Sequence, residues 1–112
     1  MIRITRQAYG HLKEIRRYIE EELSAPTAAL NTIQAIRAEI AKLAFMPEKI
    51  KTIDEEPWKS EGFRKIRVKN YYVYFWIDEE NRKVQIIAVI YVKMDQVNQL
   101  IMMRKESLQD SG

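Results

Sequence analysis

Residues 63–77 read FRKIRVKNYYVYFWI, and this stretch decides the fold. It predicts two strands joined at Lys69 and Asn70, because short runs rich in aromatic and β-branched residues are typical of strands. Side chains alternate between the faces of a strand, so each face can be examined separately. In the second strand one row is Tyr71, Val73, Phe75 and Ile77, and the opposite row is Tyr72, Tyr74 and Trp76. The first row is predicted to join the core.

The first of these strands carries cations on one side. Lys65, Arg67 and Lys69 alternate with Ile66 and Val68. If the strands pair through a tight turn, the three cations lie beside the three rings on one exposed face. Cations among flat rings suit nucleic acid. A purely solvated face would not carry three large rings, so we expect the last helix, a partner chain or a ligand to cover them, a helix or partner more than a stacked substrate.

Composition excludes several classes of protein. The 112 residues, 46% of them hydrophobic, fit a single folded domain spanning 1–112, with 109–112 as a frayed tail. There is no cysteine, so disulfides and thiolate metal sites are excluded, and one histidine, His11, excludes multi-histidine sites. We expect His11 to be structural or solvated and the protein to need no metal or cofactor. No apolar run reaches the length of a membrane helix and the start has no signal-peptide pattern, which indicates a cytoplasmic protein without a membrane partner.

Two amphipathic helices precede the central strands. Thr5 can cap the first helix, and a second helix is predicted at about residues 27–45, after a break at 24–27. The short break favours an antiparallel hairpin. The apolar stripes are Ala8, Leu12, Ile15, Ile19 and Leu23 in the first helix, and Leu30, Ile33, Ile36, Ile40 and Leu43 in the second.

The remaining elements complete an α+β fold. Residues 2–4 form an N-terminal strand, residues 48–62 form a connector pinned by Trp58, and residues 84–92 form a strand that is apolar on both faces and therefore central. A C-terminal helix is predicted at about residues 96–107. We thus expect an α-helical hairpin packed on an antiparallel β-sheet, a three-strand meander. One core should bury Leu12, Ile15, Ile19, Ile33, Ile40, Val73, Phe75 and Ile86.

Four segments resemble the RelE/ParE superfamily of bacterial type II toxins over nearly the whole chain. Residues 43–47 (LAFMP) resemble the end of the family's helical hairpin, and residues 64–71 (RKIRVKNY) resemble its basic strand and turn. Residues 73–80 (VYFWIDEE) and 84–91 (VQIIAVIY) resemble its last two strands. The resemblance implies the same α+β fold and a cognate antitoxin that wraps the toxin.

The resemblance also implies candidate catalytic residues. Members that cut mRNA in the ribosomal A site use basic and phenolic side chains without a metal, and a 2′-hydroxyl attacks the adjacent phosphate. Lys65 and Arg67 match two basic strand positions of these members, and Tyr72 stands where they carry an arginine. Tyr91 and Lys93 fall where basic residues or a histidine are frequent. Lys65, Arg67 and Lys93 would hold phosphate, and Tyr72 or Tyr91 would act in proton transfer or stacking.

Three functions remain open. The two basic strand residues favour a growth-arresting toxin that is a ribosome-dependent endoribonuclease, such as a plasmid-stabilization module encodes. The alternatives are a ParE-like, non-enzymatic inhibitor of DNA gyrase, and a degenerate, non-toxic binding domain of the same fold. We also expect a partner antitoxin to cover apolar surface, including the rings of Tyr72, Tyr74 and Trp76 and the methionines Met102 and Met103.

Overall fold

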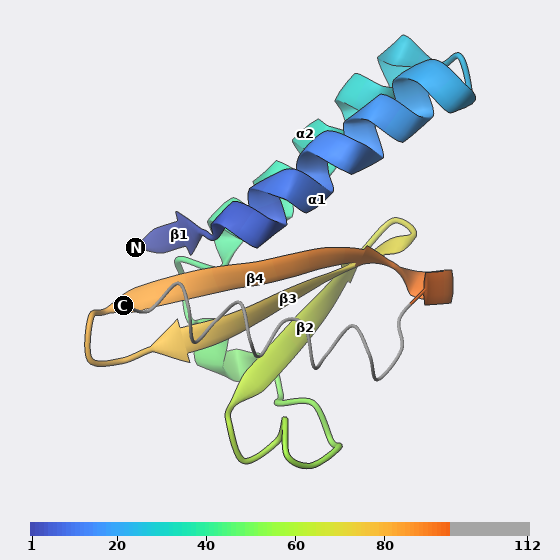
Figure 1. The fold of residues 1–112 in the computed structure, drawn as a ribbon. Coiled ribbons are helices and arrows are strands. Elements are labelled where there is room, and N and C mark those ends of the chain that lie inside the picture. Colours follow the sequence, from blue (N-terminus) through green and yellow to red (C-terminus); the bar gives the residue numbers. More distant parts are fainter. Residues whose placement is uncertain (95–112) are drawn as a thin grey trace.

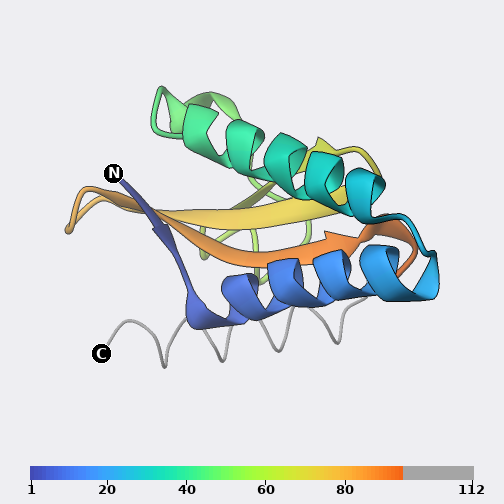
Figure 2. The same cartoon turned by 90° about the horizontal axis from the view of Figure 1, so that it is seen from above.

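The computed structural model describes residues 1–94, which form a helical hairpin on a four-stranded sheet (Figures 1 and 2). The strands lie in the order β1-β4-β3-β2. Their bounds are Ile2–Ile4 for β1, Phe63–Val68 for β2, Tyr71–Asp78 for β3 and Lys83–Tyr91 for β4. The predicted C-terminal helix and tail, with Met102 and Met103, lie outside the described residues.

The sheet is mixed rather than purely antiparallel. β2, β3 and β4 form the predicted antiparallel meander, but β1 pairs with β4 in parallel. The parallel pairing follows from the chain path, because the helical hairpin and two further strands separate β1 from β4 and let both run in the same direction. β4 therefore has a strand on each side, which confirms the central position that its apolar sequence predicts.

The helical hairpin consists of α1 (Arg6–Arg17), a π-helical turn η1 (Tyr18–Glu22) and α2 (Pro26–Lys42). Thr5 caps α1 as predicted, since its hydroxyl accepts a hydrogen bond from the Ala8 N–H at 3.2 Å. Pro26 begins α2, at the position where the missing N–H of proline costs nothing. Both helices pack against the sheet through one core cluster, and Figure 1 draws them above the strands.

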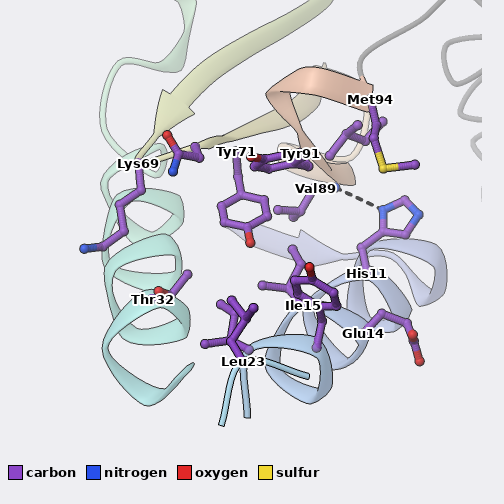
Figure 3. A pocket seen from close by; sticks show the side chains of 14 residues that line it. His11, Glu14, Ile15, Leu23, Thr32, Lys69, Tyr71, Val89, Tyr91 and Met94 are labelled. Carbon is purple, nitrogen blue, oxygen red and sulfur yellow. Dashed lines mark hydrogen bonds between the residues drawn. The ribbon is translucent and has the colours of Figure 1, made fainter. Parts of the chain in front are cut away.

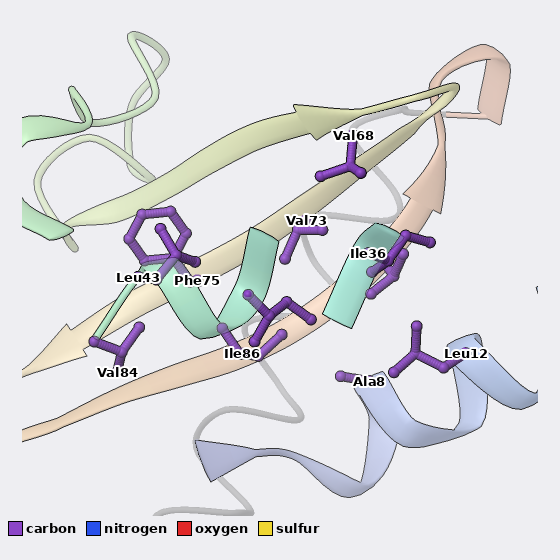
Figure 4. Packing of buried hydrophobic residues seen from close by; sticks show 11 residues of the cluster. Ala8, Leu12, Ile36, Leu43, Val68, Val73, Phe75, Val84 and Ile86 are labelled. Atoms are coloured by element: carbon purple, nitrogen blue, oxygen red, sulfur yellow. The ribbon is translucent and has the colours of Figure 1, made fainter. Parts of the chain in front are cut away.

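The main core lies between this hairpin and the sheet (Figure 4). Leu12 from α1, Ile36 and Ile40 from α2, and Val73 and Phe75 from β3 are almost fully buried there. Most of the predicted core residues are confirmed as buried, whereas Ile15 and Ile33 are partly buried at its margin. Val73 and Phe75 are in this core and Tyr74 is not, so the alternation predicted for β3 holds.

A second cluster covers the opposite face of the sheet. The connector contributes Ile53 and Trp58, which pack with Phe63, Tyr74 and Ile87. Trp58 is 5% exposed, and its ring meets the Phe63 ring edge-on with centroids 6.2 Å apart. The prediction that Trp58 pins the connector to the domain is therefore confirmed.

The apolar stripes predicted for the two helices include residues that are exposed at the connected end of the hairpin. Leu23 and Leu30 are half exposed, although the sequence predicts that both are buried. The π-turn at Tyr18–Glu22 interrupts the regular helical spacing, and the connected end of the hairpin rises away from the strands (Figure 1). At the other end α2 stops at Lys42 rather than at Phe45, which is 80% exposed. No helix within residues 1–94 is long and apolar enough to cross a membrane.

Candidate functional site

Two surfaces carry the polar and aromatic side chains of interest, and they lie on opposite sides of the sheet. The first, called the outer face, is the side away from the helical hairpin. Lys65 and Tyr74 occupy paired positions there, as do Arg67 and Tyr72 on the neighbouring part of the same two strands. The predicted placement of strand cations beside aromatic rings is therefore present in the structure.

Lys65 is held by these rings. Its ammonium lies 4.2 Å from the centroid of the Tyr72 ring and 5.6 Å from that of the Tyr74 ring. Both distances are within the range of a cation–π interaction. The two rings meet edge-on with centroids 6.3 Å apart. Arg67 is exposed, and its Nε donates to the backbone oxygen of Lys69 at 3.0 Å.

The outer face differs from the prediction in two respects. Tyr74 is 1% exposed and Tyr72 and Trp76 are half-buried, so the ring row is not an open platform. The cause is the second cluster, to which the connector adds Ile53 and Trp58. The third cation, Lys69, is not in the strand but in the turn, where its φ is +54°, and it lines the opposite side of the sheet.

Tyr91 is also on the opposite side from Lys65, Arg67 and Tyr72. It pairs with Tyr71 across β3 and β4, and the centroids of these two rings are 5.7 Å apart. Lys93 is exposed in a short 3₁₀ turn, Val92–Met94, that follows β4. The structure thus brings together Lys65, Arg67 and Tyr72 but places Tyr91 away from them.

The second surface is a groove between α1, η1 and the adjoining ends of β3 and β4 (Figure 3). Its volume is about 860 Å³. The phenols of Tyr18, Tyr71 and Tyr91 line it, together with His11 and Glu14. We call it the hairpin groove.

Burial affects two titratable groups of the hairpin groove. Burial lowers the pKa of His11, whose Nδ1 accepts a hydrogen bond from the Val89 N–H at 3.1 Å. Burial also raises the pKa of the Tyr71 phenol, and the nearby phenols of Tyr91 and Tyr18 add to this increase. The hydrogen bond ties His11 to β4, and both groups favour their neutral forms.

The described residues offer a limited chemical repertoire. No group of three His, Cys, Asp or Glu side chains in residues 1–94 could hold a metal ion. The outer face supplies two cations and a phenol, which can bind phosphate or stack on a flat group. His11, Tyr71 and Tyr91 could move protons, but they lie on the other side of the sheet.

Sequence reasoning missed the hairpin groove because of a bulge in β4. Phe75 pairs with Ile86 and Tyr74 pairs with Ala88, so Ile87 is an extra residue in the ladder. The alternation therefore changes side after Ile87, which directs Tyr91 into the groove. Residues 84–90 are apolar apart from Gln85, and this uniform sequence gives no signal of the change.

Comparison with protein families identifies a related family. The family described as the ParE toxin of type II toxin–antitoxin systems matches residues 2–96, most of the chain. Comparison with curated proteins gives no match.

Solved structures show the same fold. One is the chromosomal ParDE toxin–antitoxin system from P. aeruginosa, with a TM-score of 0.67, 21% identity, and coverage of 81% of this chain and 94% of that one. Another is the toxin–antitoxin complex RelBE2 from Mycobacterium tuberculosis, with a TM-score of 0.53, 18% identity, and coverage of 81% and 95%.

Proposed function

This chain belongs to the ParE toxin family of type II toxin–antitoxin systems, and we propose that it arrests growth by binding DNA gyrase without catalysing a reaction. Gyrase is proposed as the target because the chain resembles ParE-like toxins, which inhibit gyrase. A protein that acts on gyrase works in the cytoplasm. The proposal replaces the preference for mRNA cleavage that two basic strand residues alone suggested.

The separation of the candidate catalytic side chains is the observation that carries this proposal. Cleavage through a 2′-hydroxyl needs one group to take a proton and another to give one, both within hydrogen-bonding reach of the same phosphate. Within residues 1–94, the phenol of Tyr91 and the imidazole of His11 line the hairpin groove, whereas Lys65 and Arg67 lie on the outer face. The outer face keeps Tyr72 as its phenol, but the Lys65 ammonium lies against that ring.

An antitoxin is the proposed second partner. The two structural relatives are described as a ParDE system and a toxin–antitoxin complex. The chain exposes large apolar side chains suited to a protein partner, among them Tyr9, Leu30 and Phe45, which are 52%, 50% and 80% exposed. The ring row is less available to that partner, since Tyr74 is already buried.

Ribosome-dependent mRNA cleavage is the second candidate. One observation favours it: Lys65 and Arg67 lie on one face with Tyr72, which stacking and phosphate binding both require. Lys93 would add a cation from the end of β4. In this candidate Tyr72 would replace the arginine of the mRNA-cutting members, and Tyr91 would have no access to the phosphate held by Lys65.

Two assays run side by side test the proposal. The purified chain is added to gyrase with relaxed plasmid, and to a translation extract in which the integrity of the message is followed. The proposal predicts loss of supercoiling and an intact message. Cleavage of the message within translating ribosomes, with normal supercoiling, would contradict it.

A double variant, Lys65→Ala with Arg67→Ala, sharpens the test. Surface charges at a protein contact contribute about 0–1 kcal/mol each, so the variant should inhibit gyrase with a potency within about thirtyfold of the wild type. For a ribonuclease, the loss of two phosphate contacts would reduce cleavage by orders of magnitude. Lys13→Ala with Lys49→Ala is the matched control, because both lysines are exposed and neither belongs to β2 or β3.

A further inference from the structure

Side chains of Thr5 and of α1 continue the hydrogen-bond ladder of β4 where β1 stops. β1 pairs with β4 only as far as Ile86. Beyond this point Thr5 Oγ1 donates to the Ile86 oxygen at 2.8 Å and Gln7 Nε2 donates to the Ile87 oxygen at 3.0 Å. The next contact has the opposite polarity, since the Val89 N–H donates to His11 Nδ1 at 3.1 Å.

The backbone of Val89 faces α1 rather than β3. The Val92 N–H donates to the oxygen of Asn70, in the turn between β2 and β3. The backbone groups of Val92 and of every second residue before it, such as Ile90, therefore point toward β3. Backbone N–H and C=O groups of successive residues point to alternate edges of a strand, so those of Val89 and Tyr91 point away from β3. Among residues 1–94, His11 is thus the group that satisfies the Val89 N–H.

This contact depends on the protonation state of one ring. Because Nδ1 accepts a hydrogen bond, the geometry assigns the ring proton to Nε2. A protonated imidazole has two donors and no acceptor, so the Val89 N–H would then face another N–H. Neither the hydroxyl of Thr5 nor the amide of Gln7 changes its protonation in this range, so His11 is the pH-sensitive contact of the three.

We propose that His11 is an acid-released clasp: protonation of its ring frees the Val89 edge of β4 and opens the hairpin groove. The groove lies directly beside this contact, with His11 and Val89 both in its lining (Figure 3). Release of this contact frees the part of α1 around His11 from β4, while Thr5 and Gln7 still hold the start of the helix. This device is independent of the proposed target, since it concerns the wall of the groove alone.

Burial sets the condition of release, and two charged groups share the lining of the groove with His11. They are Glu14, on the same helix, and Lys69, from the turn between β2 and β3. The phenols of Tyr18 on η1, Tyr71 on β3 and Tyr91 on β4 are the other titratable groups of the groove. Because burial lowers the pKa of His11 from its ordinary value of 6.5, the folded chain binds this proton less well than the unfolded chain. The clasp is therefore closed above pH 6.5 and opens as the pH falls through the lowered pKa.

The single histidine of the chain makes the test direct. Nitrogen NMR of the full chain, labelled at histidine, reports the tautomer and the titration of His11, and amide hydrogen exchange reports the protection of Val89. We expect a neutral ring protonated at Nε2 at pH 7.5. As the ring titrates, exchange of Val89 should accelerate at least about tenfold beyond its intrinsic pH dependence, relative to Val73 in the core.

Two variants complete the test. His11→Asn places a non-titrating oxygen close to the position of Nδ1, so Val89 should stay protected across the same pH range. His11→Phe removes the acceptor, so Val89 should exchange rapidly at every pH. Protection of Val89 that is unchanged by titration, protection in His11→Phe, the opposite tautomer, or global unfolding before His11 titrates would each overturn the proposal.

Discussion

The two faces of the sheet are built from the same strands but are covered by different means. The hairpin face meets two helices, and its central residues Val73 and Phe75 are fully buried among side chains from α1 and α2. The outer face receives Ile53 and Trp58 from an irregular connector, which bury Tyr74 but leave Tyr72 half-buried. A face covered by regular helices is dominated by packing, whereas the outer face also leaves room for cations over rings.

Residues suited to tests of stability therefore lie on the hairpin face, and residues suited to tests of function lie on the outer face. Val73 and Phe75 on the hairpin face have no surface left for a partner. Lys65 and Arg67 on the outer face can change without creating a cavity in the main core, so they are suited to functional tests. The hairpin groove is an exception on the covered side, since it forms where η1 and the end of α1 leave the strands.

Replacing Phe75 should have the largest effect. Phe75→Ala removes a fully buried ring from the main core, and such truncations cost about 3–5 kcal/mol in the free energy of unfolding. Denaturant unfolding followed by circular dichroism measures the loss. Phe45→Ala is the control, because Phe45 is 80% exposed and its loss should change the free energy by about 0.5 kcal/mol or less. Equal effects at the two positions would contradict the assignment of the core.

Replacing Trp58 tests the coverage of the outer face. Trp58→Ala removes the largest side chain of the second cluster, and we expect a loss near the lower limit for such truncations, about 3 kcal/mol, because a connector can relax more than a helix pair. Fluorescence of the remaining tryptophan, Trp76, should report a more solvated outer face. An unchanged free energy of unfolding would show that the connector does not hold this face.

Removing the cap of α1 should have a smaller effect. Thr5→Ala loses the hydrogen bond to the Ala8 N–H and the bond to the Ile86 oxygen, at a cost of about 1–2 kcal/mol. Thr5→Ser keeps the hydroxyl and should retain most of the free energy of unfolding. If both variants lose the same free energy of unfolding, the methyl group of Thr5 rather than its cap hydrogen bond explains the effect.

Removing the Lys65 charge should have the smallest effect on stability. Lys65→Met keeps much of the apolar stem but loses the cation above the rings of Tyr72 and Tyr74, which costs about 0.5–1 kcal/mol. The same change at exposed Lys13 is the control. Unfolding measured at low and high salt should show a difference between the two variants, and no difference would mean that the ring contact contributes nothing.

The sequence predicted correctly those features of the two faces that depend on regular local patterns. The alternation from Tyr71 to Ile77, the central β4 and the role of Trp58 follow from patterns that depend on neighbouring residues. The capped start of α1 follows in the same way, from Thr5 alone.

The misses depend on contacts distant in sequence or on single backbone residues. The parallel partner of β4 is β1, which lies some eighty residues earlier (Ile2 pairs with Val84). The bulge at Ile87 moved Tyr91 to the groove, and the positive φ of Lys69 moved that cation off the outer face. The bulge is not visible in the local pattern, because the apolar side chains at 86–90 satisfy either register.

The proposed contact of this toxin with gyrase can be tested by the state of DNA in arrested cells. The chain is induced without an antitoxin, and plasmid supercoiling and message integrity are measured in the same cells before and after growth stops. Contact with gyrase predicts loss of negative supercoiling, intact messages, and arrest that survives Lys65→Ala with Arg67→Ala. Messages cut within translated codons, with supercoiling unchanged and with arrest abolished by the double variant, would contradict it.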